Sequence, residues 1–156
     1  MGFKQSITGV VFIGGLEAFV AKPYPDIAGI PTVGYGSTHY EDGSPVHLSD
    51  PEITIARGQA MLQKDCLKCE LALNHLVTVP LGQHQVDALI AFMYNVGITG
   101  FATSTILKTI NTTGPKTVTE EMFTRWDKVH DPKTGALQDS NGLLNRRRLE
   151  YKYYSV

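Results

Sequence analysis

The sequence predicts a mainly helical α+β fold with a small β-containing segment near the N-terminus. Apolar residues recur at helical spacing through most of the chain, which favours helices. Residues 24–47 are instead rich in Gly, Pro, Tyr, Thr and Val, a composition typical of short strands and turns. The chain has 156 residues, 42% of them hydrophobic, enough for one domain with a real core or for two small lobes that share a long element.

The first expected element is a helix over residues 1–16, which ends at Glu17. Its apolar residues keep helical spacing, among them Phe3, Ile7, Val10 and Val11. The β region follows over residues 24–47, where the pair Asp42-Gly43 predicts a hairpin turn between two short extended runs.

A long helix is expected next, from a capping box at Ser49 and Glu52 to about His75. It contains Cys66 and Cys69 as a lone C-x-x-C, and the sequence offers neither a second pair nor ligand-spaced histidines to complete a zinc site. Because the pair lies in mid-helix rather than at a helix N-terminus after a strand, we expect two reduced, structural thiols.

Four or five further helices are expected after Pro80. The best core helix covers about residues 81–95 and is ended by Gly97 and Gly100. A short helix over about residues 104–111 follows it. The spacing of Thr117 and Glu120 then predicts a second capping box, before a helix that includes Trp126.

The last helix is expected to start near Gly142, after a loop over residues 131–141, and it carries Arg146, Arg147 and Arg148. Consecutive helical residues point about 100° apart, so we expect one buried arginine and two solvated ones. The whole chain, 1–156, is interpreted as a single domain of two lobes with a cleft between them. Its expected parts are a β-containing lobe (about 16–50), a connecting helix (about 50–76) and a helical lobe (about 77–156 with helix 1–16).

Composition argues against several functions. With 14 Lys+Arg, 15 Asp+Glu and a pI near 6.5, the chain has no global basic field, and we expect no nucleic-acid partner. Residues 1–107 carry 5 basic and 9 acidic side chains, whereas residues 108–156 carry 9 basic and 6 acidic ones, so the C-terminal part is the better surface for an anionic polymer. The five histidines show no i,i+4 pair, and no metal site is expected.

The apolar stretch Ile7–Leu16 is far shorter than the roughly 20 residues that span a bilayer. The N-terminus also lacks the charged segment and small-residue cleavage site of a signal peptide. We therefore expect no stable membrane insertion and accumulation in the cytoplasm.

Candidate chemistry lies in the run from Glu17 to Thr32. We expect the Glu17 carboxyl, at a helix end against the core, to be partly desolvated and to favour its neutral form. Asp26, in a non-helical stretch, is expected to stay solvated and ionised. Such a pair suits hydrolysis of a glycosidic bond, with Glu17 as acid and Asp26 as nucleophile or base. The hydroxyl of Thr32 can hold a water beside the carboxylate. An attacking water requires carboxyls roughly 6.5 to 9.5 Å apart and direct attack about 5 to 5.5 Å, a choice the sequence leaves open.

Eight residues separate Glu17 from Asp26 and five separate Asp26 from Thr32, and the last two residues lie in YPDIAGIPTVGYGST. This pattern closely resembles the active-site signature of phage-type lysozymes, the endolysins of glycoside hydrolase family 24. Residues 85–97 look like that family's central helix with its N-V-G end. Trp126 and residues 142–150 are similar to its C-terminal W…GLxxRRxxE block. The three blocks span residues 17 to 150, nearly the whole chain.

The resemblance implies a lysozyme-like fold and an endo-acting muramidase without a cofactor, which cleaves β-1,4 bonds between N-acetylmuramic acid and N-acetylglucosamine in bacterial peptidoglycan. Glu17 would be the general acid, Asp26 the base and Thr32 the holder of the water, in an inverting mechanism. The implied substrate-binding residues are Tyr24, Asn95 and Arg146, and Arg146 would also reach the Glu17 carboxyl. A monomer stored in the host cytoplasm would reach the wall when a holin permeabilises the membrane.

The chain departs from the family pattern T-I-G-Y-G-H-T, because Ser37 stands where the usual histidine would be. That histidine is mainly structural in the family, so a local stabilising contact is in doubt. The loop 131–141 is also longer than the minimal family pattern. Two alternatives remain: a lytic transglycosylase that leaves 1,6-anhydro products, which the presence of Asp26 and Thr32 disfavours, and a peptidoglycan-binding protein without turnover.

Overall fold

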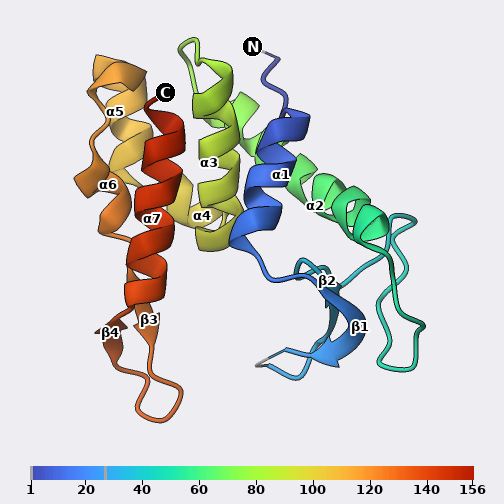
Figure 1. The fold of residues 1–156 in the computed structure, drawn as a ribbon. Helices are drawn as coiled ribbons and strands as arrows, with labels where there is room; N and C mark the ends of the chain where they lie inside the picture. Colours follow the sequence, from blue (N-terminus) through green and yellow to red (C-terminus); the bar gives the residue numbers. More distant parts are fainter. Residues whose placement is uncertain (1, 27) are drawn as a thin grey trace. The chain divides into compact units, whose positions relative to one another are not determined.

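The computed structural model describes residues 2–26 and 28–156, and it is mainly helical with two small antiparallel hairpins (Figure 1). The predicted α+β, mainly helical class is confirmed. Internal contacts divide the chain into two compact units. One is Ser6–Lys68, and the other joins the N-terminal residues up to Gln5 with Cys69–Val156. The first helix thus groups with the strands, whereas we expected it in the helical lobe, and the boundary falls inside the long helix that we expected to connect the lobes.

The Ser6–Lys68 unit begins with α1 (Ile7–Leu16), capped by the Ser6 side chain, which accepts a hydrogen bond from the Gly9 N–H at 2.9 Å. The helix was expected over residues 1–16, of which residue 1 lies outside the described residues. The helix starts later because the Asn74 side chain binds both backbone groups of Phe3. Its Oδ1 accepts from the Phe3 N–H at 2.7 Å, and its Nδ2 donates to the Phe3 carbonyl at 2.8 Å. Those backbone groups cannot then join a helical ladder.

Strands β1 (Val20–Pro25) and β2 (Pro31–Gly34) pair antiparallel, with Tyr24 opposite Thr32. The expected turn at Asp42-Gly43 is present, because Gly43 adopts φ +88° and a bridge between His39 and Pro45 closes it. Only isolated bridges flank this turn, so the β region is smaller than its composition suggested.

Helix α2 (Ile55–Leu76) begins later than the predicted capping box at Ser49 and Glu52, and that prediction is wrong. The Ile53 N–H donates to the Ala21 carbonyl in β1 at 2.9 Å, which keeps the preceding residues extended. Thr54 caps the helix instead, accepting from the Arg57 N–H at 3.2 Å. Both cysteines on α2 are reduced and buried, as expected.

The remaining elements form the helical unit. Glycine in the left-handed region separates two of them, since Gly97 has φ +85° and lies between α3 and α4. Their bounds are α3 (Gln83–Val96), α4 (Ile98–Ala102), α5 (Thr105–Thr113), the 3₁₀ turn η1 (Pro115–Thr117), α6 (Glu120–Thr124), β3 (Lys128–His130), β4 (Leu137–Asp139) and α7 (Asn141–Tyr154).

Three expectations for this unit are wrong. Thr117 does not cap α6, because its hydroxyl donates to the Gly114 carbonyl at 2.8 Å and Thr119 occupies the cap position. Helix α6 is also short, so Trp126 lies beyond its end. The predicted loop 131–141 is in part a hairpin, in which β3 pairs with β4 and an ion pair between Lys128 and Asp139 joins the two strands.

The core of the helical unit is centred on α3. Figure 1 shows α7 beside α3, and α7 packs against both α3 and α6. The Phe92 ring meets the rings of Phe101, Phe123 and Trp126 edge-on, with centroids 5.3 to 6.5 Å apart. Edge-to-face pairs of this kind add about 0.5–1.5 kcal/mol each beyond area burial. Nowhere in residues 2–26 and 28–156 is a helix both long and apolar enough to cross a bilayer.

Candidate active site

Glu17 lies at the C-terminal end of α1. Its N–H donates to the Ile13 carbonyl at 3.0 Å, while its own φ of −103° and ψ of 140° are extended. The residue is half-buried. The helix therefore ends at this position, as the sequence predicted.

Asp26 follows β1 in a tight turn that holds its carboxylate. Its Oδ1 accepts the backbone N–H groups of Ala28 and Ile30, both at 2.8 Å. Its own N–H donates to the Ile30 carbonyl at 2.9 Å. Both of these bonds to the carboxylate end on Oδ1, so Oδ2 keeps its lone pairs for other partners.

Thr32 is joined to the same turn. Its hydroxyl donates to the Ile30 carbonyl at 2.9 Å, and only 3% of the residue is exposed. Ile30 is therefore shared, because its N–H holds Asp26 and its carbonyl holds Thr32. The strand register places half-buried Tyr24 directly opposite Thr32. The structure thus brings Tyr24, Asp26 and Thr32 together at one end of the β1–β2 hairpin.

Asn95 and Arg146 belong to the other unit. Asn95 lies near the end of α3, where its Oδ1 accepts from Arg147 Nη2 at 2.5 Å. Arg147 is 0% exposed, and its guanidinium lies over the Phe92 ring at 5.0 Å. Sequence reasoning left open which of the three arginines is buried, and only the helical spacing of Arg147 from Glu150 could have singled it out.

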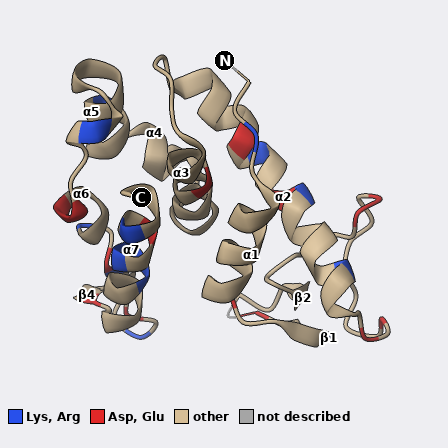
Figure 2. Cartoon of the chain, turned by 45° about the horizontal axis from the view of Figure 1, so that its top comes forward, with Lys and Arg blue, Asp and Glu red and all other residues tan. Residues whose placement is uncertain are grey.

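The arginine run on α7 is divided differently from our expectation. Glu150 Oε1 pairs with Arg146 Nε at 3.0 Å, and Oε2 pairs with Arg147 Nε at 3.3 Å. Exposed Arg148 pairs with Glu120 at 3.6 Å. One arginine, Arg147, is buried as expected, but Arg146 is half-buried and not solvated, because positions i−4 and i−3 both lie one turn before Glu150. Figure 2 shows this concentration of basic residues on α7.

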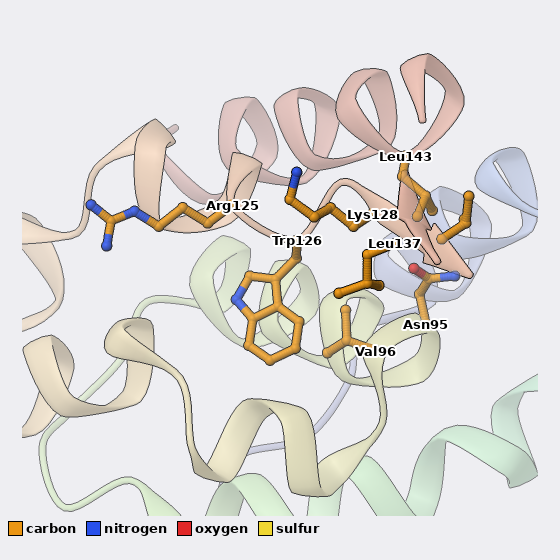
Figure 3. A pocket seen from close by; sticks show the side chains of 8 residues that line it. Asn95, Val96, Arg125, Trp126, Lys128, Leu137 and Leu143 are labelled. Atoms are coloured by element: carbon orange, nitrogen blue, oxygen red, sulfur yellow. The ribbon is translucent and has the colours of Figure 1, made fainter. Parts of the chain in front are cut away.

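A pocket of about 570 Å³ opens in the helical unit beside the hairpin β3–β4 (Figure 3). Sequence reasoning missed it because it depends on a hairpin that was interpreted as a loop. It is lined by Asn95, Val96, Arg125, Trp126, Lys128, Val129, Leu137 and Leu143.

Ser37, at the position of the missing histidine, makes a buried contact. Its hydroxyl donates to Asp65 Oδ2 at 2.5 Å, and the residue is 1% exposed. Burial raises the pKa of Asp65, while the Ser37 hydrogen bond and the nearby Lys68 charge oppose that rise. A local contact therefore exists here, made by a neutral donor.

Within residues 2–26 and 28–156, no group of three or more His, Cys, Asp or Glu side chains is arranged to hold a metal ion.

Comparison with known proteins identifies the class. The family model described as phage lysozyme matches residues 14–150. The endolysin of Salmonella phage P22 is 36% identical over 145 residues, which are 93% of each chain. An endolysin from Escherichia coli O157:H7 phage FAHEc1 superposes with a TM-score of 0.86 at 36% identity, covering 97% of this chain and 92% of that one. A mutant of P22 lysozyme gives a TM-score of 0.84 at 33% identity over 98% of this chain and 99% of the other.

The fold is thus that of lysozyme-like phage enzymes, mainly helical with small antiparallel hairpins. The chain belongs to the phage lysozyme family.

Proposed function

We propose that this endolysin, a lysozyme acting on peptidoglycan, hydrolyses the β-1,4 bond between N-acetylmuramic acid and N-acetylglucosamine with inversion. The observation that carries the proposal is the shared turn at Ile30, which ties the Asp26 carboxylate to the Thr32 hydroxyl. A carboxylate and a hydroxyl held by one residue are suited to bind one water molecule between them.

The hydrogen bonding of Thr32 supports one orientation of that water. Because its hydroxyl donates to the Ile30 carbonyl, Thr32 Oγ1 is left to accept. A water that donates one hydrogen to Thr32 and the other to Asp26 Oδ2 keeps a lone pair for the anomeric carbon. Asp26 then takes the proton as the C–O bond forms, acting as the general base.

Glu17 is proposed as the general acid, which protonates the leaving glycosidic oxygen as its bond to the anomeric carbon breaks. After turnover Glu17 is ionised and Asp26 protonated, and proton exchange with solvent restores both. The half-buried position of Glu17 at the end of α1 supports this role.

We propose Tyr24, Asn95 and Arg146 as substrate-binding residues. Tyr24 is supported by its register opposite Thr32, and Asn95 by its place in the pocket of Figure 3. For Arg146 the support is a side chain fixed by Glu150 and only 10% exposed, together with the family resemblance, which also suggests contact with Glu17.

Three measurements test the proposal. Glu17→Gln should abolish the clearing of peptidoglycan suspensions while leaving the far-UV circular dichroism unchanged, and a fully active variant would refute the acid assignment. Mass spectrometry of the fragments should give reducing ends. Products lighter by one water, with 1,6-anhydro ends, would instead show a lytic transglycosylase. Pelleting with walls and no soluble fragments would show a binding protein without turnover.

We further propose that the protein is a monomer that stays in the host cytoplasm until a holin opens the membrane, as the family resemblance implies. Light scattering should then give a mass near 17.1 kDa. Fractionation before lysis should find the protein in the cytoplasm, and a periplasmic pool would contradict the proposed route.

A further inference from the structure

The pocket beside the hairpin β3–β4 is mostly apolar. Val96, Leu137 and Trp126 form its centre in Figure 3, with Leu143 and Val129 completing the apolar lining. Leu137 lies on the three-residue strand β4 and is 61% exposed. The pocket volume of about 570 Å³ is within the usual range of small-molecule sites.

Asn95 supplies a hydrogen-bond donor with a fixed orientation. Arg147 has donors and no acceptor, so the atom that Asn95 turns toward it must be the amide oxygen. The Asn95 NH₂ group makes no hydrogen bond with any residue that the structure describes. Arg147 therefore acts as a positioning residue, because it leaves the NH₂ as the group that Asn95 can offer to a ligand.

The two cations of the lining already have acidic partners. Arg125 pairs with Glu121 at 2.6 Å, and Figure 3 shows its side chain extending away from Leu137 and Asn95. Lys128 pairs with Asp139 across the hairpin. Because both charges are balanced locally, the pocket favours an uncharged ligand over an anion.

We infer that this pocket binds an uncharged acyl-amide group, a methyl beside a carbonyl, on the peptidoglycan substrate. The carbonyl accepts from the Asn95 NH₂, and the methyl lies against Trp126 and Leu137. The inference rests on the proposed function for its choice of polymer. Peptidoglycan offers this chemistry in two places, the N-acetyl groups of its sugars and the amide that joins the lactyl group to the first alanine of the peptide stem.

Trp126 gives a direct readout, since it is the chain's one tryptophan. Tri-N-acetylchitotriose and N-acetylmuramyl-L-alanyl-D-isoglutamine should each be titrated while the tryptophan emission is recorded. A saturable change with either ligand supports the inference. Because the muramyl dipeptide also carries an N-acetyl group, a change with both ligands identifies the sugar N-acetyl group as the source, and a change with the dipeptide alone identifies the stem amide. Fully deacetylated chitotriose should give none. If it changes the emission equally, or if neither acetylated ligand does, the inference is wrong.

Three variants locate the binding. Leu137→Ser should weaken it about tenfold by removing apolar contact, whereas Leu71→Ser, at a position 69% exposed on α2, should leave it unchanged. Asn95→Asp keeps an oxygen for Arg147 but replaces the NH₂ with a second acceptor. That change should reduce binding of the acetylated sugar and strengthen binding of the cationic deacetylated one. A merely structural role of Asn95 and Arg147 would reduce binding of the acetylated sugar with no gain for the deacetylated one.

These titrations need no turnover, so the two proposals fail separately. Normal hydrolysis of walls without a ligand-induced change in emission overturns the pocket assignment alone. Binding with the expected selectivity but without hydrolysis overturns the proposed function and leaves the pocket chemistry standing.

Discussion

The carboxylate of Asp26 accepts the N–H of Ile30 at 2.8 Å, and the carbonyl of Ile30 accepts the hydroxyl of Thr32 at 2.9 Å. One backbone unit thus fixes both the proposed base and the proposed holder of the water. Backbone N–H groups of the turn donate to the carboxylate, and they orient it without the help of a second side chain. The position of Ile30 is consequently part of the site although its exposed side chain has no chemistry.

Thr32→Val is predicted to lower kcat on peptidoglycan by about 10²-fold, because the methyl cannot accept a hydrogen bond from the attacking water. Thr32→Ser keeps the hydroxyl and should retain most of the activity. The comparison should be made on variants whose thermal unfolding has been measured. Equal losses in the two variants would mean that packing around this buried residue, and not its hydroxyl, limits the reaction.

Ile30→Pro removes the N–H that reaches Asp26 Oδ1 and should reduce activity by at least about tenfold, whereas Ile30→Ala retains the N–H and should stay near wild type. Steady-state turnover on wall suspensions is the measurement. If the alanine variant loses as much as the proline variant, the side chain contributes more than the backbone bond.

Asp65 gives a prediction for pH. Its folded-state pKa is raised by burial, so the folded state binds this proton more tightly than the unfolded state. The stability associated with the neutral form is present below about pH 4, the unfolded value, and is lost as pH rises through the folded pKa. Asp65→Asn, which stays neutral, should therefore stabilise the fold at pH 7, and this gain should shrink toward pH 4 in urea titrations.

Asp50 provides a control of opposite sign for that experiment. The His47 N–H, which donates to Asp50 at 2.7 Å, lowers the pKa of this carboxyl. Its stabilising effect is present above the unfolded value and is lost as pH falls through the folded pKa. Asp50→Asn should therefore destabilise at pH 7 and have less effect in acid. The same pH trend for both variants would contradict the argument from Asp65.

The buried ion pairs on α7 predict a large asymmetry among neighbouring arginines. Arg147→Met leaves Glu150 buried without one of its cations and should cost about 3–5 kcal/mol of unfolding free energy. Arg148→Met breaks only an exposed pair with Glu120 and should cost at most about 1 kcal/mol. Urea unfolding followed by circular dichroism measures both, and similar costs would argue against a buried cluster.

Local patterns predicted much of this fold. Apolar residues at helical spacing predicted the main helices, because burial of one helix face determines that periodicity. The Gly- and Pro-rich segment between the first two helices predicted β1–β2. The capping boxes failed at Ser49 and Thr117 since tertiary bonds competed: Ile53 is held by Ala21 in β1, and the Thr117 hydroxyl bonds to Gly114. Such partners lie outside any local window.

The candidate site was predictable only where its residues are close together in the sequence. Glu17, Asp26 and Thr32 are close in sequence, so spacing and chemistry suffice to group them. Asn95 and Arg147 are 52 positions apart, and only the packing of α7 on α3 brings them together. The hairpin β3–β4 has three-residue strands with every residue exposed, so no alternation of apolar residues predicts it.

The stereochemistry of the first product tests the central proposal most directly. Proton NMR of a peptidoglycan digest, recorded before mutarotation, identifies the anomer formed at the new N-acetylmuramic acid end. Attack by a water held between Asp26 and Thr32 predicts the α-anomer first. The β-anomer would show direct attack by the Asp26 carboxylate, and it would contradict the inverting mechanism proposed for this enzyme.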